Sequence, residues 1–316
     1  MRLAVEIGGT KLQAALGWAD GRLADLVRAD SPAEGGAEAV RRRVADLMRR
    51  LLERAPEAVE RVGIGFGGPV DRESGRVLVS HQVAGWEGFD LAGWARRTTG
   101  LPAVVENDAN CGAVAEARLG AGRGVRRVLY TNLGSGIGGG FCVDGRLVSG
   151  PLGGEIGHTW VWDTEAGRYV HLEDLCSGWA IGRRARRWAR DGPPPAAGGG
   201  AERLLALVGG RVERIDARLV ARAAAEGDPL AARLLDETAE TLAVALASAA
   251  ALVQPERVVV GGGVAGMGEV LFGRLRRAFE ARLFVPLRGR CRVVPARMIE
   301  ENVLVGALVL EAPEAG

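Results

Sequence analysis

The sequence places acids, amides and glycines together at points where apolar segments end. The clearest group is Glu106-Asn-Asp-Ala-Asn110, which follows a short apolar run and precedes a helical pattern. A carboxylate at such a junction can take a proton from a substrate hydroxyl, and Asp108 is the candidate general base. Asp108 is equally suited to cap the helix that follows it, so the spacing alone leaves both interpretations open.

Two glycine-rich turns can present backbone N–H groups to phosphates, because no Cβ blocks the approach. Gly8-Gly9-Thr10-Lys11 adds a hydroxyl and the only lysine among 41 basic residues, and Gly134-Ser-Gly136 opens the second turn. Glu6, just before the first turn, is a candidate to order a hydrated Mg²⁺, or else it is a buried and paired acid. Each turn can also be an ordinary tight turn.

Two stretches match the G-x-G-x-x-G pattern of dinucleotide-binding enzymes, Gly134–Gly139 and Gly261–Gly266. The first leads into a strand and a hairpin, whereas a dinucleotide-binding turn opens a helix. The second does lie between a strand and a helix, but the acid near the required offset, Glu280, falls inside that helix. An NAD-dependent enzyme is therefore disfavoured, and the hairpins suit a clamp on a triphosphate.

A further cluster combines acids and histidines with glycines. It comprises Gly153-Gly-Glu155-Ile-Gly-His158, followed by His171 and Glu173. Such side chains suit the binding of sugar diols, although a lone histidine is more often structural. The Arg183–Arg190 run is interpreted as a solvated helix face, since the net charge is only +2 and gives no support for a nucleic-acid partner.

The elements that must position these groups follow from hydrophobic periodicity. Strands are predicted at residues 2–7, 11–17, 62–66, 102–106, 127–132, 141–143, 257–260 and 293–295. Helices are predicted at 37–52, 109–119 and 176–190, in three stretches before residue 257, from about 267 to 284, and at 302–310. Residues 193–200 are predicted to form a loop. This alternation predicts an α/β protein.

Composition bounds the remaining possibilities. With 316 residues and 47% hydrophobic residues, the chain has enough apolar content for a large core, which excludes disorder as its main state. Its four cysteines (Cys111, Cys142, Cys176, Cys291) lie far apart and are expected to be free thiols in a reducing compartment.

The longest apolar run, residues 242–253, is too short to span a membrane. With no signal-peptide pattern at the N-terminus, we expect a cytoplasmic protein without a membrane partner.

Taken in their order along the chain, the motifs together resemble the ROK family of bacterial sugar kinases and repressors. The matching stretches are Glu6–Lys11, Gly65–Val70, Glu106–Asn110, Gly134–Gly140, Gly153–His158 and Val260–Gly263. The resemblance implies an α/β, two-domain actin-like ATPase (ribonuclease H-like) fold with a cleft between the domains. It implies a small N-terminal domain at residues 1–109, with the C-terminal helix 302–316 packing back on it, and a large domain at 110–301.

The resemblance also implies roles for individual residues. The phosphates of ATP would lie against Gly8, Gly9, Thr10, Lys11, Gly134, Ser135 and Gly136, and the adenosine near Gly261, Gly262 and Gly263. The sugar would contact Asn107, Glu155, His158 and Glu173. Asp108 would be the general base, and Glu6 would hold Mg²⁺ through water. The implied activity is an ATP-dependent sugar kinase acting on a hexose, by default glucose, or on an N-acyl hexosamine, in a homodimer.

Three departures from the family pattern qualify these expectations. Glu6 stands where the family usually has Asp, and the sugar loop reads His81-Gln-Val-Ala-Gly-Trp86 where an Asn is frequent. The family's cysteine-rich zinc motif is absent from its counterpart, residues 164–173. Zinc is therefore not expected, because structural zinc takes four ligands, commonly thiolates. Packing around Trp160, Trp162 and Tyr169 is the hypothesised replacement for the metal.

The alternative function is a non-catalytic sugar-binding regulator of the same family. Such repressors normally carry a helix-turn-helix ahead of the first glycine motif, and here that motif begins at Glu6. Together with the presence of Asp108, this favours an enzyme.

Overall fold

The computed structural model describes residues 1–80, 83–148, 154–192 and 201–311. The predicted loop 193–200, His81 and Gln82 of the sugar loop, Gly153 and residues 312–316 lie outside the described residues. The chain divides into two compact units, the first drawn from residues 1–124, 140–154 and 300–316 and the second from 125–139 and 155–299. Within the described ranges, no helix is both long enough and apolar enough to cross a membrane.

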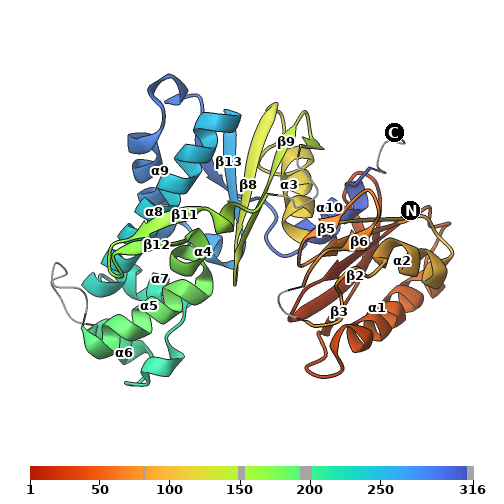
Figure 1. The fold of residues 1–316 in the computed structure, drawn as a ribbon, viewed down its shortest axis with the longest axis horizontal. Helices are drawn as coiled ribbons and strands as arrows, with labels where there is room; N and C mark the ends of the chain where they lie inside the picture. The colour runs from red at the N-terminus through yellow and green to blue at the C-terminus, as the bar shows by residue number, and fades with distance from the viewer. Residues whose placement is uncertain (81–82, 149–153, 193–200, 312–316) are drawn as a thin grey trace. The chain divides into compact units, whose positions relative to one another are not determined.

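The first unit, which carries the labels β2, β3, α1 and α2 in Figure 1, is built on a five-stranded mixed sheet with the strand order β3-β2-β1-β4-β7. The strands are β1 Arg2–Ile7, β2 Lys11–Gly17, β3 Leu23–Asp30, β4 Val62–Phe66 and β7 Ala103–Asn107. β1 pairs antiparallel with β2 and parallel with β4, and β4 pairs parallel with β7. A short hairpin of β5 (Val70–Asp71) and β6 (Arg76–Val77) follows β4.

Helices cover both faces of this sheet, and the sequence of β4 shows how the faces differ. Val62, Ile64 and Phe66 belong to the apolar core that also contains the inner side chains of α1 (Gly36–Glu53) and α2 (Leu91–Thr99). The intervening glycines face the other way, toward α3 (Asp108–Arg118) and α10 (Asn302–Val309). A Cβ on Gly63 would lie 2.0 Å from the carbonyl oxygen of Ala307, so only glycine permits this approach of α10.

α10 joins the first unit although it is the last helix of the chain. It packs against β1, β4 and α3. Arg2 Nη1 donates to the carbonyl of Leu308 (2.7 Å) and Arg118 Nη1 to that of Val309 (2.9 Å). Gly306 sets the spacing between the two helices, because a Cβ there would lie 2.0 Å from the carbonyl oxygen of Cys111.

The second sheet repeats the topology of the first. Its order is β10-β9-β8-β13-β14, with β8 Arg127–Leu133, β9 Ile137–Val143, β10 Arg146–Leu147, β13 Arg257–Gly261 and β14 Arg292–Pro295. Each sheet therefore has the strand order 3-2-1-4-5 when its own strands are numbered along the chain. β13 pairs parallel with β8 and with β14, as β4 does with β1 and β7.

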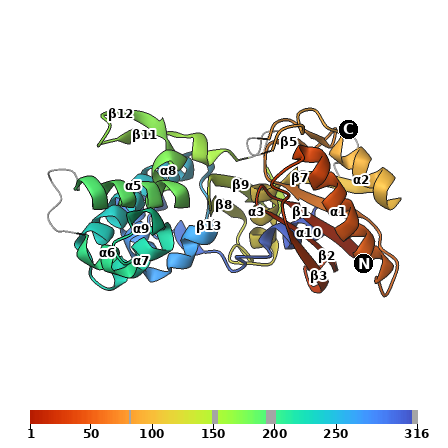
Figure 2. The same cartoon turned by 90° about the horizontal axis from the view of Figure 1, so that it is seen from below.

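The second unit is richer in helices than the first. They are α4 Leu172–Cys176, α5 Gly178–Asp191, α6 Glu202–Leu207, α7 Ala217–Ala225, α8 Pro229–Val253 and α9 Glu269–Arg282. Short 3₁₀ turns occur at Ile156–His158, Val212–Arg214, Gly263–Met267 and Val285–Leu287. A separate hairpin of β11 (Trp160–Asp163) and β12 (Arg168–His171) packs on α4, and β11 also contacts α8 (Figure 2).

The α/β class and most of the predicted elements are confirmed. β3, α2 and the β5–β6 and β11–β12 hairpins lie outside the predicted elements, and the chain forms α4 and α5 where one helix is predicted at 176–190. The break is at Ser177, whose backbone is extended and whose hydroxyl caps α5 by accepting from the N–H of Ala180 (3.2 Å). The four cysteines are free thiols and are buried, as predicted for the thiol state.

The division between the units differs from the predicted boundary at residue 109. α3 groups with the first unit because it packs against α10 and the glycine face of β4. Residues 140–154 also group with the first unit, since Arg118 of α3 donates through Nε to the carbonyl of Gly145 (2.7 Å).

The close approach of α10 to α3 predicts that Gly306→Ala destabilises the protein. The added methyl group must displace backbone, and such overpacking typically costs about 1–3 kcal/mol. Urea unfolding followed by circular dichroism measures the loss. Gly266→Ala is the matched control, because nothing lies within 4 Å of a Cβ at that position. Equal stability of the two variants would contradict the packing described here.

Candidate functional site

The first part of the candidate site lies where the parallel strands β1, β4 and β7 end together. Their register pairs Ile7 with Phe66 and Phe66 with Asn107. Gly8, Gly67 and Asp108 therefore follow at the same carboxyl edge of the sheet, which is where ligands bind in open α/β sheets. The N–H of Gly67 donates to the carbonyl of Ile7 (2.9 Å), which holds two of these strand ends together.

Asn107, not Asp108, caps α3. The side-chain oxygen of Asn107 accepts from the N–H of Asn110 (3.1 Å), and its amide nitrogen donates to the carbonyl of Gly68 (3.2 Å). The capping interpretation of Asp108 is thus wrong. Asp108 is the first helical residue, and its Oδ1 accepts from the N–H of Ala109 (2.7 Å).

Asp108 also lies beside the glycine turn that follows β4. Its Oδ2 is 3.6 Å from the position that a Cβ on Gly67 would occupy. This is an ordinary van der Waals distance, so the carboxylate lies directly beside the turn at Gly67. Gly8, Gly9 and Gly67 also line a small cavity of about 10 Å³ with Phe66, Ser80 and Trp86, which is room for about one water molecule.

A buried polar network that the sequence analysis did not assign lies behind Asp108. The Glu106 side chain is only 3% exposed, and its Oε1 accepts from the N–H of Asn107 and from Nδ2 of Asn110, both at 2.9 Å. Arg72 Nη1 donates to Glu106 Oε2 (3.2 Å). An acid within an apolar strand was the available signal for Glu106. Nothing in the sequence singled out Arg72.

The turn after β1 brings the sole lysine onto Glu6. The N–H of Gly8 donates to the carbonyl of Lys11 (3.0 Å), which closes the turn through Gly9 and Thr10. Lys11 Nζ then lies 3.6 Å from Glu6 Oε1, while Gln13 Nε2 donates to Glu6 Oε2 (2.6 Å). Burial raises the pKa of the Glu6 carboxyl above its ordinary value, although Lys11 and Gln13 act to lower it.

These partners bear on how Glu6 fits a magnesium ion. Both of its carboxylate oxygens already have a donor or a cation next to them. Mg²⁺ keeps several of its waters and typically needs only one or two carboxylates besides the phosphates. Glu6 therefore fits contact with the hydration shell of the ion better than direct ligation, as the sequence analysis suggested.

In the second unit, the two predicted nucleotide loops lie next to each other. The N–H of Gly178, at the start of α5, donates to the carbonyl of Gly134 (2.8 Å). A Cβ on Gly178 would lie 3.4 Å from Cγ2 of Val264, next to the predicted adenosine loop. Gly262 has a φ of +82°, and a Cβ there would lie 2.5 Å from the carbonyl oxygen of Leu133. Neighbouring protein atoms thus occupy the space that side chains at Gly178 and Gly262 would fill, so the two loops can lie this close together only with glycine at these positions.

The predicted sugar residues of the second unit gather around Ile137, the first residue of β9. Glu173 Oε2 accepts from the N–H of Ile137 (3.2 Å), and a Cβ on Gly157 would lie 2.1 Å from the carbonyl oxygen of Ile137. The 3₁₀ turn that carries His158 is therefore held against β9. His158 Nε2 lies 3.9 Å from Glu155 Oε2.

Aromatic rings support this histidine in the region where the zinc motif is missing. The rings of His158 and His171 meet edge to face with centroids 5.0 Å apart, and Trp160 packs on His171 at 4.5 Å. Trp162 and Tyr169 pack on each other (5.1 Å). Among the described residues, no three His, Cys, Asp or Glu side chains are grouped closely enough to hold a metal ion.

Comparison with known proteins identifies relatives of this chain among both sugar kinases and repressors. The model of a family described as "ROK family" matches residues 2–313. A glucokinase of Thermotoga maritima is 33% identical over 311 residues, which cover 96% of this chain and 95% of that protein. A xylose repressor of Caldicellulosiruptor bescii is 25% identical over 282 residues, which cover 86% of this chain and 68% of that protein.

A solved structure agrees over nearly the whole length. The ROK family glucokinase from Streptomyces griseus, in complex with glucose and AMPPNP, superposes with a TM-score of 0.81 at 32% identity. The match covers 97% of each chain. The chain therefore has the actin-like ATPase fold that its sequence motifs predicted.

The burial of Glu6 predicts a specific pH dependence of stability. Its pKa in the folded protein is raised above the ordinary value of 4.5, so its contribution to stability is complete below pH 4.5 and is lost as the pH rises through the folded-state pKa. We expect Glu6→Gln to gain stability relative to the wild type between pH 4 and pH 7, measured by urea unfolding in metal-free buffer.

Asp71→Asn supplies a control of opposite sign. A hydrogen bond from Ser74 holds the pKa of Asp71 below its ordinary value of 3.8. Its contribution is therefore present above that pH and lost as the pH falls. Asp71→Asn should lose stability relative to the wild type as the pH rises toward 3.8, and the difference should stay level above that pH, so both variants are also measured below pH 3.8. A Glu6→Gln curve that follows the same direction would contradict the assigned effect of burial.

Proposed function

We propose that this chain, which belongs to the ROK family, is an ATP-dependent hexose kinase. The acceptor is a hexose, by default glucose, or an N-acyl hexosamine. The observation that carries this proposal is the position of Asp108 at the carboxyl edge of the first sheet. Because Asn107 supplies the helix cap, the Asp108 carboxylate is not required for that task and suits the role of general base.

In the proposed reaction, a sugar hydroxyl attacks the γ-phosphorus of ATP while Asp108 takes the hydroxyl proton. The bond from the γ-phosphorus to the bridging oxygen breaks, and ADP leaves. Such transfer needs mainly alignment and charge stabilisation. Mg²⁺, when bound with ATP, neutralises phosphate charge. Glu6 would hold the ion through its water shell, and Lys11, paired with Glu6, would supply a further positive charge.

The nucleotide is proposed to contact backbone more than side chains. The phosphates would accept hydrogen bonds from the backbone N–H groups of two glycine turns, Gly8, Gly9, Thr10 and Lys11 in the first and Gly134, Ser135 and Gly136 in the second. Gly261, Gly262 and Gly263 would lie along the adenosine. The close packing at Gly262 and Gly178 supports this assignment, because it keeps both second-unit loops in fixed positions.

The sugar is proposed to be held by Asn107, Glu155, His158 and Glu173. A carboxylate and an imidazole next to each other can together bind neighbouring hydroxyls, and Glu155 and His158 form such a pair. Glu173 already accepts from the backbone of Ile137, so its second oxygen is the one suited to a sugar hydroxyl. The active protein is proposed to be a homodimer.

A sugar-binding regulator without catalysis is the second candidate. It is favoured by the similarity to the xylose repressor. A sensor needs the sugar contacts but not a general base, so the two candidates differ in what Asp108 does.

The proposal predicts that Asp108→Asn retains its fold and nucleotide binding but loses turnover. General-base catalysis contributes roughly 10²–10⁴-fold to rate, so kcat should fall by at least about 100-fold. A coupled assay of ADP release over a panel of hexoses and N-acyl hexosamines measures kcat, and ATP binding is measured by calorimetry. Polyphosphate replaces ATP in a parallel arm to test the donor.

Glu53→Gln, an exposed acid on α1, is the control and should leave kcat unchanged. If the wild type releases no ADP in response to any sugar yet binds one, the regulator is the correct candidate. If Asp108→Asn keeps full turnover, Asp108 is not the base.

Metal content gives an independent prediction. We expect well under one zinc per chain in purified, untagged protein, because His158 and His171 are two potential ligands where structural zinc takes four. Elemental analysis after dialysis measures zinc. EDTA should abolish ADP release, and Mg²⁺ should restore it. One zinc per chain that survives dialysis would refute the expectation.

A further inference from the structure

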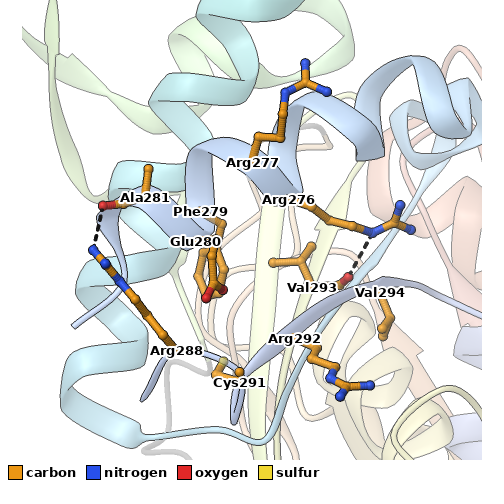
Figure 3. Close-up of a pocket in the computed structure, with 11 residues that line it drawn as sticks. Arg276, Arg277, Phe279, Glu280, Ala281, Arg288, Cys291, Arg292, Val293 and Val294 are labelled. Atoms are coloured by element: carbon orange, nitrogen blue, oxygen red, sulfur yellow. Dashed lines mark hydrogen bonds between the residues drawn. The ribbon is translucent and has the colours of Figure 1, made fainter. Parts of the chain in front are cut away.

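A pocket of about 780 Å³ lies in the second unit, apart from every residue assigned above. It is formed by the last turns of α9, the turn that follows it, and β14 (Figure 3). Its volume falls within the range of roughly 300–1,000 Å³ that is usual for small-molecule sites. We call it the α9–β14 pocket.

The floor of the α9–β14 pocket is apolar. Phe279, Cys291 and Val293 contribute to it, and each is less than 5% exposed. Burial, with a smaller effect of Glu280, raises the pKa of the Cys291 thiol to about 11. The thiol is therefore protonated near neutral pH, so the floor carries no charge and suits a hydrocarbon surface.

The rim of the pocket is strongly basic. Arg276, Arg277, Arg288 and Arg292 line it, against the single acid Glu280. Two of these arginines are held in place. Arg276 pairs with Glu269 (2.8 Å), and Arg288 donates to the carbonyls of Leu283 (3.3 Å) and Ala281 (3.2 Å) at the end of α9.

The other two arginines have no such anchor. Arg277 and Arg292 make no ion pair with any residue in the part of the chain that the structure describes. They come from α9 and from β14 and lie on different sides of the pocket (Figure 3). A guanidinium group matches carboxylate and phosphate in geometry as well as charge, so the rim offers two cations for an acidic head group.

The edge of β14 argues against an added peptide strand as the occupant. The N–H groups of Arg292 and Ala296 donate toward the neighbouring strand β13, so residues 293 and 295 face outward. Pro295 has no N–H, and Arg276 Nε already donates to the carbonyl of Val293 (3.4 Å). Strand addition needs a row of open backbone groups, and this edge lacks one.

We propose that the α9–β14 pocket binds a small organic anion, with a carboxylate or phosphate head and an aliphatic or aromatic body. The head pairs with Arg277 or Arg292 at the rim, and the body covers Phe279 and Val293. Glu280 disfavours a second acidic group on the body through like-charge repulsion. No bond is made or broken at this site, and its occupation does not depend on the proposed kinase activity.

Isothermal titration of the full chain with four probes tests this assignment. Octanoate and octyl phosphate carry the two acidic heads on one aliphatic body, 1-octanol carries the body without charge, and inorganic phosphate carries a head without a body. We expect saturable binding of octanoate, octyl phosphate or both, at least tenfold tighter than that of octanol and of phosphate. Which anion binds more tightly identifies the head group.

Three variants locate the binding. The double variant Arg277→Gln/Arg292→Gln should weaken binding of the anions at least tenfold, whereas Arg290→Gln, which removes a nearby exposed arginine outside the lining, should leave it unchanged. Ala281→Trp, at an exposed position of α9 that lines the pocket, should block binding by filling it.

The proposal is overturned if neither anion binds saturably, if octanol binds as tightly as the anions, or if the double variant and Arg290→Gln behave alike. Unfolding curves of each variant verify that it is folded. Sugar-dependent ADP release should be unchanged in the double variant, so failure of this proposal and failure of the kinase assignment are separately visible.

Discussion

The parallel register of β1, β4 and β7 determines where the first part of the candidate site lies. Because Ile7, Phe66 and Asn107 are aligned across the three strands, the next residue of each strand leaves the sheet at one edge. Shifting any of these strands by one residue would reverse which side chains face the core. The alternation of apolar residues and glycine in β4 prevents that shift, because Gly63 lies against the backbone of Ala307 and Gly65 against the side chains of Val303 and Cys111, where no larger residue fits.

Charge near this edge is balanced over several elements. Glu6 is bound by Lys11 and by Gln13, and Gln13 in turn accepts from Nε of Arg28 (2.6 Å). Arg28 also pairs with Glu301, directly before α10 (3.0 Å). A charge removed at Glu6 therefore affects contacts as far as the C-terminal helix. This linkage makes Glu6 part of the framework of the first unit as well as a candidate for the magnesium site.

Much of the fold could be predicted from the sequence, because the strands β1, β4, β8 and β13 are mostly apolar and each ends in glycine or is followed by one. The misses have a physical pattern. β3 alternates exposed and half-buried residues at the edge of its sheet, so it lacks a strong apolar signal. The β11–β12 hairpin buries only one face, so its apolar signal is also weak. Its sequence overlaps the counterpart of the family's zinc motif and was therefore not interpreted as strands.

The residues of the candidate site likewise divide into those that the sequence makes recognisable and those that it does not. Glycine turns and polar residues at strand ends are visible along the chain, whereas Arg72 reaches Glu106 from 34 residues away. Only the folded chain brings those two together. The capping role of Asn107 was also undecided in sequence, because Asn and Asp are both good caps and stand side by side.

The position of α10 has a consequence for how the protein is made. The glycine face of β4 and the adjoining part of β1 are covered by a helix that the ribosome synthesises after the whole second unit. Until residue 309 has left the exit tunnel, that apolar face of the first sheet remains without its partner. The first unit therefore completes its folding last, although its strands are the first to emerge.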